Sequence, residues 1–446
     1  MESIWRKQIK EIDSRDSSRE LYSTKSHWDV IVIGAGLAGL LTAYYLKEAG
    51  MDVLVLEADR IASGQTERTT AKITSQHGLK YSKLIKEIGV NRARFYAQAN
   101  ESAIREYERL IRTQGIDCEF ERTSAYLYSE QEESPLKEEA KAAAGLGRDA
   151  FFTKDTELPF PVAGAVCFRN QALFSPLKFV EHISRNLEIR EYVQVTGIKG
   201  NRVLTAEKEL TADKIVVTTH YPIKDIPGFY FLRQHQERSY ALALSGCGKI
   251  NGMYYGIDQE GLSFRQAGEH LLLGGGSRRT GENTCGRAYD FLEQAAKKYY
   301  PDCREEARWA AQDCMPHDGV PFIGKYSVFT PDLYVATGFQ KWGMTTSMVA
   351  AMLFRDMLCG LENPYAELFS PQRIYFRAGI KNFIADVGVS IKGLTKGVFV
   401  RPRCSHLGCA LVWNPEERSW DCPCHGSRFD GEGKVCDNPA GKDVKT

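Results

Sequence analysis

Four residues near the C-terminal end of the chain combine thiol and imidazole groups in a repeated order. Cys404 and His406 form a C-x-H pair, and Cys422 and His425 form a C-x-x-H pair. Two loops that each donate one thiolate and one imidazole can close around a [2Fe–2S] cluster, in which one iron takes both cysteines and the other takes both histidines. The same ligands also suit a tetrahedral zinc ion. The ligand types alone predict a metal centre and leave its identity open.

Two further cysteines, Cys409 and Cys424, lie within the segments CSHLGC and CPCHGS that contain the two pairs. These segments closely resemble the cluster-binding loops of the Rieske proteins of cytochrome bc complexes. The resemblance implies a Rieske [2Fe–2S] cluster on the four paired residues, and a disulfide between Cys409 and Cys424 that ties the loops. In a reducing compartment these two residues can instead remain thiols.

One position departs from the respiratory Rieske proteins. There, a tyrosine hydroxyl and a serine hydroxyl donate hydrogen bonds to the cluster and its ligand sulfur, whereas this chain keeps Ser427 and has Phe429 in place of the tyrosine. Because such donors raise the reduction potential, the missing hydroxyl predicts a value in the middle of the Rieske range of roughly −150 to +300 mV.

A second chemical signal lies near the N-terminus. The apolar run 29–33 predicts a buried strand, GAGLAG at 34–39 a turn, and 37–49 a helix. In a G-x-G-x-x-G turn the first glycine permits the tight bend, the second lets the backbone approach a pyrophosphate, and the third lets the helix pack on the strand. Glu57, after the next predicted strand at 52–56, can accept hydrogen bonds from ribose hydroxyls. The alternative is a glycine-rich turn without a ligand.

The segments that follow favour FAD over NAD. Residues 60–72 place hydroxyl side chains and a glycine directly after the ribose-binding acid, which suits a long, extended cofactor. A glycine-rich turn from Gly338, with a helix start at Thr345, can aim backbone N–H groups at the flavin pyrimidine, where negative charge accumulates on reduction.

Residues 28–360 resemble the FAD-dependent superfamily that includes glycine oxidase, sarcosine oxidase and D-amino-acid oxidase. The resemblance implies that Val195 contacts adenine through its backbone and that Thr219 and His220 form part of the cofactor wall. Sarcosine oxidases attach flavin through a cysteine on the strand before the Asp-Gly turn. Cys314 lies on that predicted strand, with a shorter spacing to Asp318 than in those enzymes, and a packed thiol is the alternative. The complete set of residues predicted to contact FAD is Gly34, Ala35, Gly36, Ala38, Gly39, Glu57, Ser63, Thr70, Ala71, Val195, Gly338, Gly343, Met344 and Thr345.

No catalytic residue is assigned. Oxidation of an amine moves a hydride from the carbon beside nitrogen to the flavin, so a strong general base is not required. Arg265 is a candidate to clamp a substrate carboxylate, with a solvated surface arginine as the alternative. His317 is a candidate to face the flavin, with an ordinary structural histidine as the alternative.

The fold class expected is α/β, with a discontinuous Rossmann-like FAD-binding domain, an α+β capping domain for the substrate, and a small C-terminal Rieske-type β and loop unit. Predicted sheet strands at 214–218 and 333–337 lie far from the first strand, which is why the domain must be discontinuous. The expected boundaries are 1–27 for an N-terminal extension; 28–365 for the oxidoreductase, with 28–79, 166–229 and 310–365 as the FAD domain and 80–165 and 230–309 as the capping domain; 366–397 for a linker; and 398–446 for the Rieske unit.

The C-terminal unit is too small to build a core of its own. The β-domain that usually supports a Rieske cluster is mostly absent from the residues before Cys404. A fragment of this size needs its cluster, its cross-links and its neighbours for stability. The sequence therefore predicts close docking on the flavin domain and no freely swinging unit.

Composition alone favours no class of partner, so any partner must be argued from local features. Lysine plus arginine (58) nearly balance aspartate plus glutamate (57), which gives no whole-chain argument for nucleic acid or an anionic membrane. The charged residues 1–25 lack the apolar run of a signal peptide, and the apolar stretch 30–46 is interrupted by glycines. We expect a cytoplasmic protein without a transmembrane segment.

The sequence thus predicts an FAD-dependent dehydrogenase for a small amine or amino-acid-like substrate. Electrons would leave singly through the cluster to a small electron-transfer protein or a quinone-like acceptor. One alternative is a reductase fed through the cluster by a ferredoxin-like donor. Another is a redox-sensing or electron-transfer module without a turnover substrate.

Overall fold

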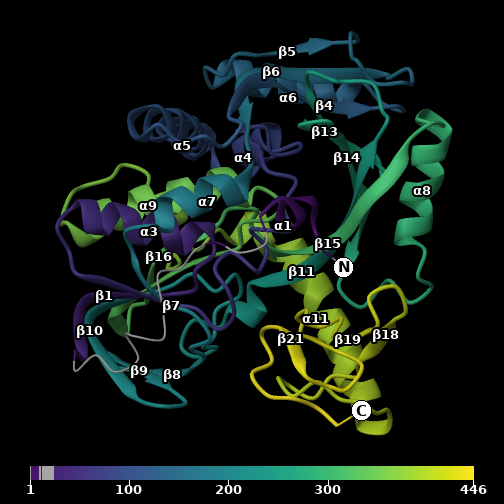
Figure 1. Cartoon of the computed structure of the whole chain (residues 1–446). Helices are drawn as coiled ribbons and strands as arrows, with labels where there is room; N and C mark the ends of the chain where they lie inside the picture. Colours follow the sequence, from purple (N-terminus) through teal and green to yellow (C-terminus); the bar gives the residue numbers. More distant parts are fainter. Residues whose placement is uncertain (1, 10–11, 13–24, 446) are drawn as a thin grey trace.

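The computed structural model describes residues 2–9, 12 and 25–445. Much of the expected N-terminal extension, residues 10–11 and 13–24, lies outside this described part. Two large sheets with surrounding helices make up most of the described chain, and a small four-stranded sheet forms its C-terminal end (Figure 1). The short helix α1 (Ile4–Gln8) packs inward, with a buried Trp5 whose indole donates to the carbonyl of Thr69 (2.8 Å).

The first sheet is built around β1 (His27–Ile33), which pairs in parallel with β2 (Val53–Leu56) and β10 (Glu209–Val217). The apolar runs of these strands are buried, and their alternate side chains belong to two different core clusters, as in a sheet that is covered on both faces. The strands predicted at 29–33, 52–56, 214–218 and 333–337 are all present. The sheet order is β16-β17-β10-β1-β2-β7, with β9 on β10 and β8 on β9. The remaining strands are β7 (Glu188–Arg190), β8 (Val195–Lys199), β9 (Arg202–Thr205), β16 (Phe322–Ser327) and β17 (Thr330–Thr337).

Helices α3 (Leu37–Glu48), α7 (Pro176–Ser184) and α9 (Gly343–Leu358) pack together against this sheet (Figure 1). The helix predicted at 37–49 is confirmed as α3. The other helices before the linker are α4 (Tyr81–Ile88), α5 (Val90–Gln114), α6 (Ser134–Gly145) and α8 (Ala288–Tyr299). No helix among the described residues has the length and apolar character needed to cross a bilayer.

The second sheet has nine strands, with β11 (Gln234–Ser245) antiparallel between β14 (His270–Arg279) and β15 (Arg304–Pro316). This sheet includes β3, most of β6 and the end of β15, which fall within segments expected in the FAD domain. The order is β15-β11-β14-β13-β12-β4-β6-β3, with β5 on β6. Its other strands are β3 (Lys72–Ile73), β4 (Glu121–Ser129), β5 (Ala150–Thr153), β6 (Gly164–Leu173), β12 (Met253–Gly256) and β13 (Ser263–Ala267).

The expected linker at 366–397 is mostly helical. After α10 (Ala366–Phe369), the 24-residue helix α11 (Phe376–Phe399) leads directly to the C-terminal unit (Figure 1). Its glycines meet that unit closely: a methyl carbon at Gly393 would overlap the sulfur of Cys424, and one at Gly397 would overlap the carbonyl oxygen of Gly408. The Ala410 amide also donates to the carbonyl of Gly393 (3.0 Å).

The C-terminal unit, residues 400–445, has four short strands and, against the expectation from its size, a small buried core of its own, formed largely by cysteines. The strands are β18 (Val412–Asn414), β19 (Ser419–Asp421), β20 (Arg428–Phe429) and β21 (Val435–Asp437). Arg238 of β11 pairs with Glu417, which also accepts a hydrogen bond from the buried Arg428 (2.7 Å). Gln236 of the same strand donates to the carbonyls of His425 (2.8 Å) and Asn438 (2.9 Å). These contacts hold the unit against the second sheet, as its small size predicts.

Candidate cofactor and cluster sites

The turn between β1 and α3 has the geometry of a phosphate-binding turn. Gly34 has φ +105°, a conformation that favours glycine. A methyl carbon at Gly39 would overlap the carbonyl oxygen of Gly34, so the third glycine lets α3 lie against the strand. The Ala35 amide donates to Glu57 Oε2 (2.7 Å), which joins the end of β2 to the turn. Burial raises the pKa of Glu57 despite hydrogen bonds from backbone amides.

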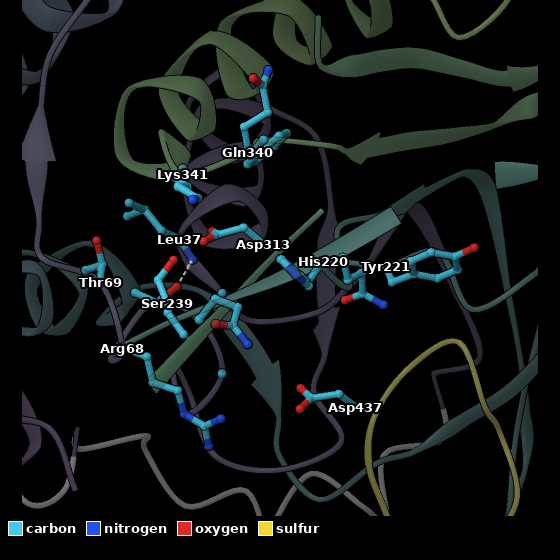
Figure 2. Close-up of a pocket in the computed structure, with 18 of the residues that line it drawn as sticks. Leu37, Arg68, Thr69, His220, Tyr221, Ser239, Asp313, Gln340, Lys341 and Asp437 are labelled. Carbon is cyan, nitrogen blue, oxygen red and sulfur yellow. Dashed lines mark hydrogen bonds between the residues drawn. The ribbon is translucent and has the colours of Figure 1, made fainter. Parts of the chain in front are cut away.

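A cavity of about 1060 Å³ extends from this turn (Figure 2). Thr219 and His220 line it as expected. The predicted cofactor contacts that line it are Gly34, Gly36, Ala38, Glu57, Ser63, Thr70, Val195, Gly343 and Met344. A glycine turn at a helix N-terminus, an acid beside it and a volume of this order fit a large dinucleotide.

The other five predicted contacts, Ala35, Gly39, Ala71, Gly338 and Thr345, are outside the cavity lining. The hydroxyl of Thr345 bonds to both backbone groups of Thr74 (2.9 Å each), which fixes the start of α9 on the neighbouring segment. This contact holds the start of α9, where Gly343 and Met344 line the cavity.

Arg265 is neither on the surface nor in the cavity lining, which corrects both expectations for it. It is buried on β13 and donates to four backbone carbonyls, those of Thr70 (2.9 Å), Ala71 (2.7 Å), Phe174 (3.3 Å) and Gln266 (2.8 Å). Burial lowers the pKa of this guanidinium to about 9. Its hydrogen bonds go to backbone, so the geometry supports a role in shaping the 70–71 segment and gives no support to a carboxylate clamp.

His317 and Cys314 are also outside the cavity lining. His317 Nε2 pairs with Asp386 Oδ2 on α11 (2.6 Å), so the imidazole links the flavin domain to the linker helix. The thiol of Cys314 is buried and donates to the carbonyl of His220 (3.6 Å). This geometry favours the alternatives of a structural histidine and a packed thiol.

Several charged residues that the sequence analysis did not select also line the cavity, among them Lys72, Asp313 and Lys341. Lys341 Nζ contacts Ser277 Oγ (2.6 Å) and Glu237 Oε2 (3.1 Å). Burial raises the pKa of Asp313 to about 7, and its carboxylate accepts no hydrogen bond from the described residues. Burial, with the nearby positive charge of Arg265, lowers the pKa of Lys72 to about 7. The only feature of the sequence that could have pointed to these three residues is a charged side chain beside an apolar or glycine-rich segment.

A line of polar contacts joins this cavity to the C-terminal unit. From Lys341 it passes to Glu237, whose Oε1 lies 3.4 Å from His235 Nε2. His235 Nδ1 lies 3.0 Å from Asp386 Oδ2 on α11. Arg279 contacts the other oxygen of Asp386 and donates to two backbone carbonyls of the second Cys–His loop (2.7 and 2.9 Å). The cavity and the loop therefore share one polar network.

The two Cys–His segments form matching loops. The Gly408 amide donates to the carbonyl of Cys404, and the Gly426 amide donates to the carbonyl of Cys422, both at 2.9 Å. Both glycines have positive φ, +83° and +88°. Both ligand cysteines are buried in one small core. The paired loops that the sequence predicts are therefore present.

The two histidines offer nitrogen atoms that need a partner. Nδ1 of His406 and Nδ1 of His425 are buried without a hydrogen-bond partner among the described residues, and the rings are 5.1 Å apart. Burial lowers the pKa of His425 to about 3, which keeps this imidazole neutral and able to bind metal. His406 Nε2 pairs with Asp225 Oδ2 (2.8 Å), and an imidazole held at Nε2 is oriented for ligation through Nδ1. The donor set fits a cluster.

The expected disulfide between Cys409 and Cys424 is wrong for this structure. All twelve cysteines, which lie within the described residues, are free. The sulfur atoms of Cys409, Cys422 and Cys424 lie within 4.8 Å of one another, so they form a group of buried thiols. The loops are held instead by their backbone hydrogen bonds and by α11.

Comparison with known proteins agrees with both sites. Residues 29–357 match the family described as FAD dependent oxidoreductase. The chain belongs to this family. Residues 391–446 match the Rieske [2Fe-2S] domain. This FAD-dependent oxidoreductase therefore binds FAD, and its C-terminal unit binds a Rieske [2Fe–2S] cluster, which decides against zinc.

Known relatives share one or both parts. A Bacillus subtilis protein described as a Rieske 2Fe-2S iron-sulfur protein, YhfW, is 35% identical over 94% of this chain and 92% of its own length. Glycine oxidase of Pseudomonas aeruginosa is 24% identical over 75% of this chain and 95% of its own. The crystal structure of glycine oxidase from Geobacillus kaustophilus matches 78% of this chain and all of its own, with a TM-score of 0.67 and 18% identity, so it shares the fold.

Substitution of Phe429 tests how the side chain at this position affects the reduction potential of the cluster. Its ring is buried in the same core as the ligand cysteines. Phe429→Tyr should restore a donor near the cluster and raise its midpoint potential by about 40 mV, the equivalent of about 1 kcal/mol in a one-electron couple. A redox titration followed by EPR measures the shift, with Phe429→Leu as a control that adds no hydroxyl. A lower potential in the tyrosine variant would contradict the argument.

Proposed function

We propose that this oxidoreductase is a dehydrogenase for a small amine or amino-acid-like substrate, with the Rieske cluster as the exit for its electrons. FAD, when bound, supplies the acceptor for a hydride from the carbon beside nitrogen. The chain itself must bind and orient the substrate and hold the two redox sites at a fixed separation. The natural acceptor would be a small electron-transfer protein or a quinone-like molecule.

The observation that carries this proposal is the position of the C-terminal tail. Cys436, Asp437, Asn438, Pro439, Gly441 and Lys442 line the same cavity as the glycine turn. Figure 2 shows Asp437 on the wall of this cavity. The ring of Phe231 in η1 (Tyr230–Leu232) lies 5.9 Å from the ring of His406 and 5.7 Å from that of His425. A one-electron carrier so placed supports an electron path out of the flavin site.

Lys341 and Asp313 are the residues we propose to bind the substrate. Both line the cavity, and Figure 2 shows their side chains near one another within it. The ammonium group of Lys341 suits a carboxylate, and the carboxylate of Asp313 suits a cationic amine. Together they match a zwitterionic or amine substrate.

Replacing Asp313 tests this assignment. Asp313→Asn should raise the KM for a cationic amine by about tenfold, the cost of one charge-assisted hydrogen bond. Because burial raises the pKa of Asp313 to about 7, the carboxylate is charged only above that pH, and the wild-type KM should fall as the pH rises through 7. The asparagine variant should lose this dependence.

Lys341→Met is the matched control. It should raise the KM of substrates that carry a carboxylate and leave simple alkylamines unaffected. Steady-state kinetics of both variants across pH measure these effects. An unchanged KM and pH profile for Asp313→Asn would show that the residue does not bind substrate.

Anaerobic mixing of the holoprotein with a panel of amines and amino acids tests the function itself. A substrate should bleach the flavin absorbance and generate the EPR signal of the reduced cluster in sequence. Flavin that reoxidises with O₂ at full rate while the cluster stays oxidised would refute the electron path. Reduction of the flavin only from the cluster side would instead support a reductase.

A further inference from the structure

The outer face of α11 carries a row of exposed apolar side chains. Ile384 is 63% exposed and Phe399 is 85% exposed. The others in this row are Ile380, Phe383, Ile391, Leu394 and Val398. Their spacing by three, four and seven residues places them along one side of the helix. A continuous apolar row of this length is uncommon on a free surface and marks an interaction site.

Basic side chains accompany this row, and exposed acids do not. Lys381, Lys392 and Lys396 are exposed on the helix, and the exposed Arg401 follows it. The single acid between positions 376 and 403 is Asp386. It is buried on the inner side, where it pairs with two histidines and an arginine. The outer face therefore combines apolar and cationic groups.

The inner face of α11 is held firmly to the rest of the protein. Gly379 lies against His317, with only 3.2 Å between a methyl carbon placed there and the histidine Cβ. Gly393 and Gly397 lie against the two cluster loops. The helix is therefore fixed in place, with its apolar and basic side directed away from the domains that it joins.

We propose that the outer face of α11 docks the protein on the surface of an anionic lipid bilayer. The apolar row would enter the boundary between headgroups and acyl chains, and the lysines would meet lipid phosphates. At 1.5 Å per residue the helix offers about 36 Å of contact parallel to the membrane. Since no helix among the described residues can span a bilayer, the attachment is peripheral.

Charge argues for lipid over a second copy of this chain. A symmetric dimer through this face would bring each patch against its own copy, and therefore lysines against lysines with no exposed acid on the helix to neutralise them. An anionic bilayer offers both the apolar interior and the opposite charge. The same docking would place the cluster one helix diameter from the membrane, where, if the proposed function holds, it can reduce a quinone-like acceptor.

Co-sedimentation with lipid vesicles tests the docking without any turnover. The holoprotein should sediment with vesicles of phosphatidylcholine mixed with phosphatidylglycerol, and much less with phosphatidylcholine alone. Added salt should weaken binding, because surface charges are screened. Since no substrate is present, this result is independent of the dehydrogenase proposal.

Two variants identify the face. Ile384→Asp with Ile391→Asp should weaken vesicle binding by about tenfold or more, and Lys392→Gln with Lys396→Gln by about tenfold with a loss of salt dependence. Val328→Asp with Phe329→Asp is the matched control, since these residues are 71% and 81% exposed in the turn between β16 and β17. Flavin and cluster absorbance confirm that each variant folds; if the isoleucine pair fails this check, the lysine pair decides.

Several results would overturn the proposal. These are no binding of the wild type to anionic vesicles, equal loss in the control pair, or binding unaffected by both the isoleucine and the lysine variants. Light scattering that shows a dimer dissolved by the isoleucine variant would assign the face to a second copy and also overturn it.

Discussion

Replacing Arg428 by methionine is expected to release the C-terminal unit from the protein and to cost it the cluster. The guanidinium is buried and bonds to Asp421 (3.0 Å), Asp437 (2.9 Å) and Glu417 (2.7 Å). Removing one partner from a buried ion network leaves uncompensated charge, at about 3–5 kcal/mol. This loss of stability should lower the temperature at which the visible circular dichroism signal of the cluster disappears.

The pH dependence of this loss follows from the carboxylates. Burial opposes ionisation of Asp437, but the positive charges of Arg428 and Arg238 lower its pKa to about 2. In the wild type this group therefore stabilises the fold above its unfolded pKa of about 4, and the contribution disappears as the pH falls through 2. In Arg428→Met the deficit should be largest at neutral pH and smaller near pH 4, where the carboxyls can protonate.

A control lies in the turn between β18 and β19 of the same small sheet. Arg418 is exposed, and Arg418→Met should change stability by less than about 0.5 kcal/mol. Equal effects of the two substitutions, or a deficit independent of pH, would show that the buried network does not hold the unit in place.

Replacing Gly397 by alanine is the second large effect. Alanine normally stabilises a helix by about 1 kcal/mol relative to glycine. Here its methyl group would overlap the carbonyl oxygen of Gly408 and lie 3.1 Å from the amide nitrogen of Ala410, and neither backbone atom can move without opening the first cluster loop. We expect a loss of about 1–3 kcal/mol in the docked unit, measured as lower iron content and a lower melting temperature of the cluster signal.

Gly388 provides the opposite control on the same helix. A methyl carbon at Gly388 would meet no atom within 4 Å, so Gly388→Ala should stabilise the protein. Flavin absorbance should be unchanged in both variants. If both substitutions stabilised the protein, the close contact between α11 and the loop would be absent in solution.

The sequence predicted those parts of the molecule whose signals are local. The first strand, the turn at Gly34 and the helix after it follow from hydrophobic period and glycine spacing within one short segment, and the paired loops from ligand spacing. The segment that forms α11 was predicted to be a linker because of Pro371, its basic residues and its weak hydrophobic period, and its four glycines also disfavour a helix. Contacts between this helix and the cluster loops outweigh the low helix propensity, and such tertiary contacts cannot be predicted from the local sequence.

The candidate site shows the same limit. Arg265 was considered because a charged residue on a capping strand can reach a substrate, yet its side chain faces backbone carbonyls from distant segments. Asp313 and Lys341 enter the cavity from β15 and from the turn before α9, which only the folded sheets bring together. Their role depends on tertiary placement, and residue type gave no reason to prefer them.

The polar line from Lys341 through Asp386 to the second cluster loop has a thermodynamic consequence. If a charged substrate in the cavity changes the reduction equilibrium of the cluster by some factor, reduction of the cluster must change the affinity for that substrate by the same factor. A substrate that favours reduction of the cluster is thus bound more tightly once the cluster is reduced. Its oxidised product carries a different charge, so its affinity depends differently on the state of the cluster. Through this network, the order of substrate binding, cluster reduction and product release depends on binding equilibria as well as on rates.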